Sequence, residues 1–442
     1  MKEKAGALLG HARQTLPEGT AAVGAGLVVA ALTSYVFVIV SLNSLAGGAA
    51  AAFSAFWAVI FVIGPGFFLP LEQEVGRAVA HRRAQGLGGG PLVHRAAKLG
   101  GIITAALVVI SLLSAPLLND QLYHGDLLFV PALAVGLVGF YVVHLTRGVL
   151  AGQGRFRAYG ELLAAEGAIR LVGAVALAAA GVDQAGAYAM VLALAPFFAA
   201  AFALRRQRGL LPPGPAAPYS ELSASLGWLL LSSVMMQALA YSSLLAVNIL
   251  AGPGEKVFVA GFASAFFVAR VPVLAFQAVQ GTLLPKLAGL AGSGRHDEFR
   301  DGLKKLLAAV VIVAVGGVVG AYLLGAQVGV KLFKDFTMGS AGLALLAAGS
   351  GAFIVSLTLA QALMALGGHR LMTAAWALGL AVCVAVIAAI PGLELRVELG
   401  YLLGSSVSLV AMGLALWTRI GRTEGMGIES LVEAIEHEPL EI

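Results

Sequence analysis

Residues 67–86, FFLPLEQEVGRAVAHRRAQG, place two glutamates and then a group of basic side chains at the end of a long apolar run. The run begins near Ala50, and the segment keeps a helical pattern where Glu72 and Glu74 occur. A carboxylate near the end of a membrane span is costly unless a cation or water meets it, so such a residue marks a functional candidate. The stretch therefore predicts a membrane-spanning helix with a polar, functional end.

The composition extends this interpretation to the whole chain. Of its 442 residues, 59% are hydrophobic and 12% are charged, whereas a soluble domain has roughly 25% charged residues. We expect an all-α polytopic membrane protein with about 12 runs that reach the ~20 residues needed to span a bilayer. The runs are 20–42, 50–76, 99–118, 127–150, 159–180 and 185–204, followed by 222–250, 257–287, 305–325, 341–366, 372–391 and 398–418.

Basic residues are distributed unevenly between the two sides of these spans. Roughly 22 lysines and arginines fall on one side and about 4 on the other, and the positive-inside rule assigns the richer side to the cytoplasm. Both termini are therefore predicted to be cytoplasmic. Because this rule accounts for the net charge of +5, we do not expect nucleic acid as a partner.

The chain divides into two lobes of six spans each. The segment 205–221, RRQRGLLPPGPAAPYSE, contains prolines that exclude a continuous helix, so we interpret it as a cytoplasmic linker between lobes 1–204 and 222–418. The loop after the fourth span resembles the loop after the tenth, which indicates pseudo-twofold symmetry about an axis along the membrane normal. The acidic segment 419–442 is either a loosely attached cytoplasmic tail or a short helix that docks a partner.

Arg270 lies deep in the predicted eighth span, with apolar sequence on both sides. A charged side chain at such a depth costs several kcal/mol, so the guanidinium should face protein or a water-filled cavity. Gln277 lies two turns further along, on nearly the same helical face. Arg270 and Gln277 are therefore candidate substrate ligands. For Arg270 the alternative is a contact to carbonyls or a glutamate that staples helices together.

The second, fourth and fifth spans carry the charges best suited to gating or ion coupling. Glu166 and Arg170 are one turn apart in a favourable pairing, so they either neutralise each other or leave Glu166 able to exchange a proton. Glu72 and Glu74 have Arg77 and Arg147 as partners, either in a salt-bridge cluster at the inner mouth or in a coupling-ion site. The candidate gating or coupling residues are Glu72, Glu74, Arg77, Arg147, Glu161, Glu166 and Arg170.

Polar side chains at helical spacing form a stripe on one face of the seventh span, and a weaker stripe occurs in the first span. Hydroxyl and amide groups in such a stripe serve equally as interhelical hydrogen-bonding groups or as ligands for a sugar. The residues that this pattern adds to the candidate substrate site are Gln237, Tyr241 and Asn248 in the seventh span and Ser34 and Ser41 in the first.

No metal-ligand set, nucleophile constellation or phosphate-binding loop stands out in the sequence. The loops on the external side are short, which disfavours a membrane glycosyltransferase or polymerase with catalytic acids in an external domain. We therefore expect neither an enzyme nor a metal or organic cofactor. Coupling to a proton or sodium gradient stays open.

Three stretches carry a resemblance to a known family. They are PLEQEVGRAVAHRR at 70–83, GVLAGQGRFRAYGELLAAEGAIRL at 148–171 and RVPVLAFQAVQGTLLPKL at 270–287. They resemble the polysaccharide flippase branch, whose substrates are O-antigen-type lipid-linked oligosaccharides, of the multidrug/oligosaccharidyl-lipid/polysaccharide (MOP) exporter superfamily. The resemblance covers roughly residues 15–420. It implies two six-helix lobes around a central cavity, lined by the first, second, seventh and eighth spans, that opens alternately to the two sides of the membrane.

The resemblance also implies a function. Members of this branch translocate a polyprenyl-pyrophosphate-linked oligosaccharide across the bacterial plasma membrane for cell-surface polysaccharide biosynthesis, and their buried arginines hold the anionic head group, as Arg270 is placed to do. Expected partners are the lipid-linked glycan, membrane lipids and glycan-assembly enzymes. The alternative is a small-molecule exporter of the multidrug (MATE) or major-facilitator type. Against the MATE type, the first span, 20–42, lacks the acidic residue typical of that branch.

Overall fold

The computed structural model describes residues 20–222, 226–252, 254–273, 276 and 296–437, with the backbone alone for 20, 296 and 421–437. In these residues the regular structure is entirely helical. Among them, 11 helices are long and apolar enough to cross a membrane, and the bent pair α9 and α10 brings the number to 12 when it is counted as one span. The predicted all-α polytopic fold with about 12 spans is thus confirmed.

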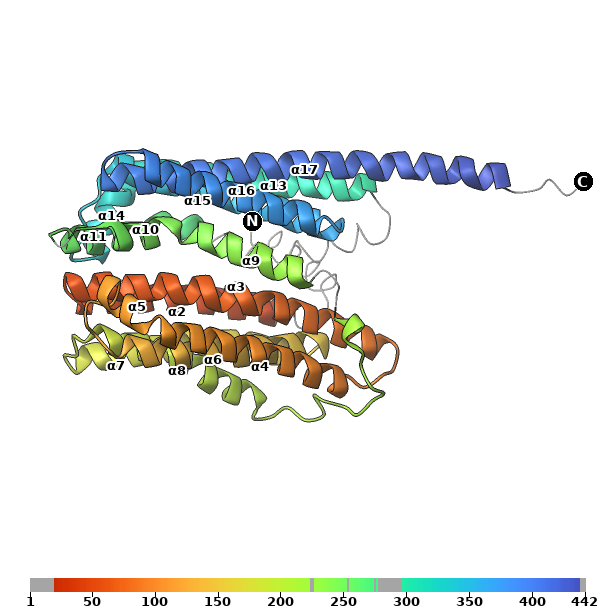
Figure 1. Ribbon diagram of the computed structural model, residues 1–442, viewed down its shortest axis with the longest axis horizontal. Coiled ribbons are helices and arrows are strands. Elements are labelled where there is room, and N and C mark those ends of the chain that lie inside the picture. The colour runs from red at the N-terminus through yellow and green to blue at the C-terminus, as the bar shows by residue number, and fades with distance from the viewer. Residues whose placement is uncertain (1–19, 223–225, 253, 274–275, 277–295, 438–442) are drawn as a thin grey trace, which may run out of the picture.

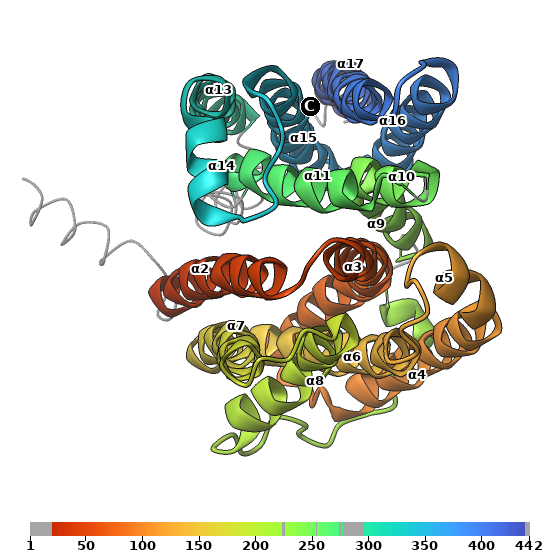
Figure 2. The same cartoon turned by 90° about the vertical axis from the view of Figure 1, so that its left-hand side faces the viewer.

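The first helices of the chain gather in one lobe, called the N-lobe here (Figure 1, Figure 2). Within it α2 packs along α7, and a Cβ atom added to Gly26 or Gly160 would overlap the backbone of the other helix. Glycine at these positions therefore permits the close approach of the two helices. The N-lobe helices are α2 Thr20–Ser44, α3 Gly48–Ala84, α4 Gly90–Leu113, α5 Ala115–Gln121, α6 Phe129–Gly152, α7 Phe156–Ala179 and α8 Ala185–Leu204.

The remaining helices form the C-lobe on the other side of the molecule (Figure 1). Here α15 and α16 both pack against α17, and α13 packs against α15. The C-lobe helices are α9 Leu226–Ala240, α10 Ser242–Leu250, α11 Lys256–Ala269, α13 His296–Gly320, the π-helical segment η2 Ala321–Gly325, α14 Ala326–Leu332, α15 Ser340–Ala365, α16 His369–Ala389 and α17 Leu393–His437. The backbone of α17 thus continues as a helix into the segment that the sequence placed in the acidic tail.

The long helix α3 lies between the two lobes and contacts both. Its 37 residues pack against α6 of the N-lobe and against α9, α10 and α11 of the C-lobe. Although Pro65 and Pro70 lie inside it, the helix continues to Ala84, beyond the predicted end of the span at residue 76. Glu72, Glu74 and the basic group that follows them therefore belong to the same helix as the apolar run.

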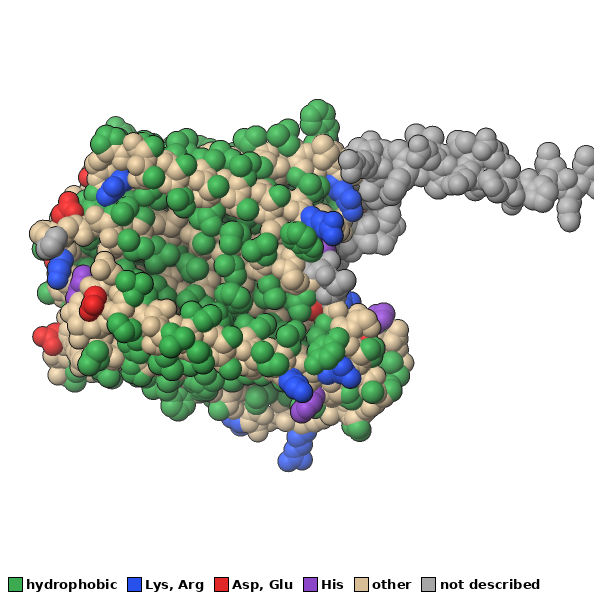
Figure 3. Space-filling view, in the orientation of Figure 1, with side chains coloured by type: hydrophobic (Ala, Val, Ile, Leu, Met, Phe, Trp, Pro, Cys, Tyr) green, Lys and Arg blue, Asp and Glu red, His purple; other side chains and the backbone are tan. Residues whose placement is uncertain are grey.

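The surface fits a membrane environment. On the face shown in Figure 3, hydrophobic side chains cover most of the described residues, and charged side chains gather toward the two ends. Large apolar residues on the flanks are widely exposed, among them Ile102 at 60% and Ile312 at 72%. A soluble monomer rarely exposes so continuous an apolar surface, so the chain is a multi-pass membrane protein. The end of α3 that carries Arg77, Arg82 and Arg83 is called the basic end below.

The linker 205–221 is held against the basic end of the N-lobe. The buried guanidinium of Arg82 binds both carboxylate oxygens of Glu221, with Nε 2.6 Å from Oε2 and Nη2 2.9 Å from Oε1. Its Nη1 also donates to the carbonyl oxygens of Gly88 and Pro215, each at 3.0 Å. The linker contains no α-helix and ends in a 3-10 turn at Tyr219–Glu221. The bonds to Arg82 fix it to the N-lobe up to Glu221.

This ion pair predicts a pH dependence of stability. The hydrogen-bonded Arg82 guanidinium holds the pKa of Glu221 below its ordinary value of 4.5. A carboxyl group whose pKa is lowered in the folded state stabilises the fold above its unfolded-state pKa, and the contribution is lost as the pH falls through the folded-state pKa. Glu221→Gln should therefore lower the thermal unfolding midpoint at neutral pH, and the difference from wild type should shrink as the pH falls below the ordinary value of 4.5.

The measurement is the difference between the midpoints of wild type and Glu221→Gln across a pH series in detergent. Asp183→Asn is the control, because Asp183 is exposed in the loop before α8. A midpoint difference for Glu221→Gln that does not change with pH would show that the ion pair makes no titratable contribution.

Candidate functional site

A cavity of about 100 Å³ lies between the two lobes. Its walls come from α2, α3, the bend between α9 and α10, and the end of α11, which are the first, second, seventh and eighth spans. Aromatic side chains dominate the lining, and Arg270 is its charged group. The lining residues are Ser34, Tyr35, Val38 and Trp57 from the N-lobe and Tyr241, Phe266, Phe267, Arg270 and Val273 from the C-lobe.

Arg270 combines the two interpretations that its sequence position left open. Its Nη1 donates to the backbone carbonyl of Ala240, which ties the end of α11 to the seventh span. The guanidinium carbon also lies 4.8 Å from the ring centre of Tyr241 and 4.9 Å from that of Phe266, a cation–π arrangement. Among the described residues no carboxylate forms an ion pair with Arg270, so its charge is available to the cavity.

The bend in the seventh span explains why Arg270 finds its carbonyl partner there. The axes of α9 and α10 differ by 58°, and Tyr241 lies between the two helices. A carbonyl at the end of a helix lacks its intrahelical partner, and Arg270 supplies a donor to Ala240 at this point. The guanidinium, the aromatic ring and the helix break are therefore one local unit that faces the cavity.

The polar stripe of the seventh span serves mainly to join it to α3. Gln237 donates its side-chain amide to the carbonyl of Phe61 at 2.9 Å, and Asn248 donates to the hydroxyl of Ser54 at 3.1 Å. Of the predicted stripe residues, Tyr241 lines the cavity and the other two make these interhelical bonds. Their contact with a substrate stays a prediction.

The bond to Phe61 has a cause in the sequence. Pro65 follows Phe61 by four residues in α3 and has no N–H group, so the carbonyl of Phe61 lacks its usual helical donor. Gln237 fills that vacancy from the neighbouring lobe. The hydroxyl of Ser233 similarly donates to the carbonyl of Pro65 at 3.3 Å. The two lobes are thus joined at the level of the proline.

Of the other three residues predicted to bind substrate, one lines the cavity, one is buried away from the cavity lining and one is not described. Ser34 lines the cavity as part of α2. Ser41 is fully buried, and its hydroxyl has no hydrogen-bond partner among the described residues. Gln277 lies outside the described residues.

A second polar cluster, here called the charge network, is buried inside the N-lobe. Glu72 of α3 accepts a hydrogen bond from Nδ1 of His144 at 2.6 Å and another from the hydroxyl of Tyr159 at 2.7 Å. Glu166 of α7 binds Arg170 through one oxygen and Arg147 through the other. Arg147 also lies 4.0 Å from Glu72, so the network runs continuously across α3, α6 and α7.

The charge network balances its charges in a buried environment. Glu72, Glu166 and Arg170 are 8%, 5% and 6% exposed, and the side chain of Arg147 is 15% exposed. The network's two carboxylates, Glu72 and Glu166, match its two guanidiniums, Arg147 and Arg170, in number. Mutual compensation is what permits charges to be buried at this depth. The predicted pairing of Glu166 with Arg170 is present, and Arg147 extends it.

The remaining predicted gating residues lie toward the basic end. Glu74 is buried and pairs with Arg77, whose Nε lies 3.2 Å from each carboxylate oxygen. Glu161 pairs with the exposed Arg157 at 3.1 Å on the surface of α7. Glu72 and Glu74 are thus directed to different partners, and Glu161 is not part of the charge network.

Sequence reasoning missed several residues of these sites. Tyr159 precedes Glu166 by seven residues and shares its helical face, and His144 precedes Arg147 by three. That spacing would have added both to the charge network. Trp57 and Tyr35 of the cavity carry no such signal, because an aromatic residue in an apolar span is also typical of lipid-facing or packed positions.

Comparisons with known proteins agree with the architecture. No family model matches the chain. Two proteins of Mycobacterium tuberculosis, from strains CDC 1551 and H37Rv and both described as uncharacterized, are each 28% identical over 432 residues, covering 90% of this chain and 91% of theirs. An outward-facing MATE family transporter of the MOP superfamily superposes with a TM-score of 0.71 at 14% identity, covering 92% of this chain and 96% of its own.

Two further structures are also similar in fold. A MATE protein in a bent conformation has a TM-score of 0.68 at 15% identity, covering 93% of this chain and 99% of its own. An inward-facing MATE family transporter has a TM-score of 0.68 at 16% identity, covering 89% and 95%. The chain therefore has the fold of the MATE transporters of the MOP superfamily.

Proposed function

We propose that the protein is an alternating-access exporter whose substrate crosses the membrane between the two lobes and carries negative charge near Arg270. The single observation that carries this proposal is a cation in a cavity at the lobe interface, held in place by a helix break and two aromatic rings. The fold supports it, since MATE transporters of this fold have been solved in outward-facing and inward-facing conformations.

The proposed orientation places the basic end in the cytoplasm of a bacterial plasma membrane, with both termini on that side. It rests on the distribution of lysine and arginine between the two sides. In this orientation Asn43, whose amide donates to the carbonyl of Leu332 at 2.6 Å, joins the two lobes at the external end. Such a contact has to break when the lobes open outward.

The substrate that we propose is a polyprenyl-pyrophosphate-linked oligosaccharide, delivered by glycan-assembly enzymes. A pyrophosphate offers anionic oxygens that a guanidinium binds strongly. A cavity of about 100 Å³ holds only a few water molecules, so the lobes have to separate before such a head group enters. When the lobes separate, the hydrogen bonds from Gln237 and Asn248 to α3 would break, and the two side-chain amides could then bind the substrate.

A second candidate is export of a small organic molecule by a MATE-type mechanism. The solved neighbours favour it more than they favour the glycolipid, because they are MATE transporters. The major-facilitator form of this alternative does not agree with the fold. A cationic drug requires an anionic group in its path, and the described cavity lining offers Arg270 instead. The charge of the cavity therefore favours an anionic substrate.

Reconstituted liposomes separate these candidates. We expect the purified protein to translocate a fluorescent polyprenyl-pyrophosphate-linked oligosaccharide and not a fluorescent organic cation. Transport of the cation without the glycolipid would establish the MATE-type function instead. Repeating the assay with an imposed proton or sodium gradient tests coupling, for which we propose the hydrogen-bonded pair of Glu72 and His144. A transport rate that neither gradient changes would exclude coupling to protons or sodium ions.

A further inference from the structure

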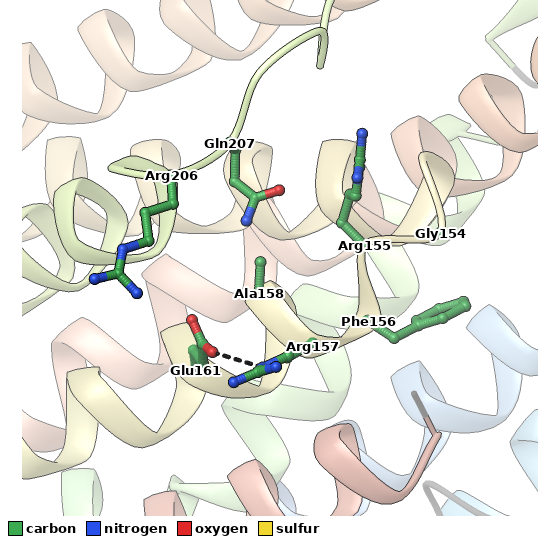
Figure 4. Close-up of a pocket in the computed structure, with 8 residues that line it drawn as sticks. All are labelled: Gly154, Arg155, Phe156, Arg157, Ala158, Glu161, Arg206 and Gln207. Atoms are coloured by element: carbon green, nitrogen blue, oxygen red, sulfur yellow. Dashed lines mark hydrogen bonds and ion pairs between the residues drawn. The ribbon is translucent and has the colours of Figure 1, made fainter. Parts of the chain in front are cut away.

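A second pocket opens at the basic end of the N-lobe, apart from the cavity between the lobes. Its volume is about 510 Å³, and it lies where α6 ends, α7 begins and α8 passes into the linker. Figure 4 shows Arg155 and Arg206 on either side of the opening, with Gln207 between them and Glu161 near its floor. None of these residues lines the cavity between the lobes or belongs to the charge network.

The pocket carries a surplus of positive charge. Arg155, Arg157 and Arg206 line it together with one acidic residue, Glu161. Glu161 is already bound to Arg157, with Nε and Oε1 3.1 Å apart. Arg155 and Arg206 are exposed and form no ion pair with a described residue. Two arginines of the pocket lining are therefore left without a carboxylate partner among the described residues.

Backbone amide groups at the start of α7 also make the pocket favourable for an anion. Arg155 is the residue before α7, and its side chain does not cap the first turn of that 24-residue helix. The amide groups of an uncapped first turn favour an anion, as the N-terminal end of the helix dipole does. Phe156, Arg157 and Ala158, which form this turn, belong to the pocket lining. The backbone donors and the two arginines thus border the same pocket.

An exposed apolar face leads along α8 toward the pocket. Leu194, Phe198 and Phe202 recur every fourth residue and are 38%, 58% and 43% exposed. At the end of this row, Arg205 lies with its guanidinium carbon 3.4 Å from the ring centre of Phe202 and donates to the carbonyl of Phe202. A cation that folds over an aromatic ring at a helix end is typical of the boundary between hydrocarbon and head groups.

We propose that this pocket binds the phosphate head group of an anionic phospholipid, whose acyl chains lie along the exposed face of α8. The ligand class follows from combining an anion site with an adjoining apolar face, since a soluble phosphate would use only the first. The planar guanidinium of an arginine matches phosphate oxygens in geometry and charge. The proposal is independent of the transported substrate, because the pocket is separate from Arg270.

The test measures binding of phosphatidylglycerol and phosphatidylcholine to the full-length protein in detergent, by native mass spectrometry. We expect a preference for phosphatidylglycerol that Arg155→Gln/Arg206→Gln weakens roughly 30-fold, because each cation near an anionic lipid contributes a factor of about five. The matched control is Arg95→Gln/Arg370→Gln, whose arginines are predicted on the same side and stack on Tyr219 and Trp228 outside the pocket. This control should leave the preference unchanged.

A second variant keeps the test decisive if the double variant is unstable. Glu161→Gln removes the acidic side chain from the pocket and releases Arg157, so it should strengthen binding of phosphatidylglycerol. Equal binding of the two lipids, or unchanged binding in both pocket variants, would overturn the proposal. Displacement of phosphatidylglycerol by millimolar inorganic phosphate would reassign the pocket to a soluble anion.

Discussion

Glu166→Gln is expected to destabilise the protein by about 3–5 kcal/mol, the range found when one partner of a buried ion pair is removed. The carboxylate of Glu166 binds Arg147 through one oxygen and Arg170 through the other, and all three groups are buried or nearly so. Glutamine keeps the shape but supplies no charge. Arg170 would then lose its carboxylate partner, and Arg147 would keep only Glu72, at 4.0 Å.

The measurement is the midpoint of thermal unfolding in detergent, followed by size-exclusion chromatography. Glu161→Gln is the matched control, because Glu161 lies in the same helix and pairs with an arginine whose side chain is 88% exposed. A surface pair of this kind contributes about 0–1 kcal/mol. Similar losses for both variants would show that the charge network contributes no more than the surface pair does.

A double variant tests the reason for this loss. In Glu166→Gln/Arg170→Gln one buried cation is removed together with the carboxylate, so Arg147 and Glu72 again balance each other. If uncompensated charge causes the destabilisation, the double variant should be more stable than Glu166→Gln alone. An additive, larger loss would instead attribute the effect to packing.

The spans were predictable from sequence because the bilayer fixes their length and apolarity. Contacts one turn apart, such as Glu166 with Arg170, were predictable for a similar reason, since helix geometry alone brings them together. Contacts between different spans could not be predicted in this way. Whether Glu72 of α3 meets Arg147 or His144 of α6 depends on how the two helices are rotated about their axes, and their largely apolar sequences do not define that rotation.

The inter-lobe cavity was predictable in part. Arg270 was expected to face it, because a lone cation in an apolar span requires a polar environment. The bend at Tyr241 was not expected, since neither glycine nor proline marks it in the sequence. By contrast, the bond from Gln237 to Phe61 follows a rule that was available, because a proline always deprives the carbonyl four residues earlier of its donor.

Arg270→Gln is expected to reduce translocation of an anionic substrate by about 100-fold, since a hydrogen bond to a charged group in a desolvated site contributes up to about 3 kcal/mol. Glutamine still donates to a carbonyl, so the tie to Ala240 can persist while the charge is lost. Arg270→Lys keeps the charge but not the planar stacking on Tyr241 and Phe266, so we expect an intermediate rate. The measurement is the initial rate in proteoliposomes.

The control is Lys331→Gln, because Lys331 is an exposed cation near the end of α14, outside the cavity. It should leave the rate unchanged, and unfolding midpoints of all three variants would separate loss of transport from loss of fold. If Arg270→Gln transported the substrate at the wild-type rate, the guanidinium would have no role in transport. A higher rate for an organic cation in the same variant would show that Arg270 repels cations from a MATE-type path, because charge alone distinguishes the two substrates at this position.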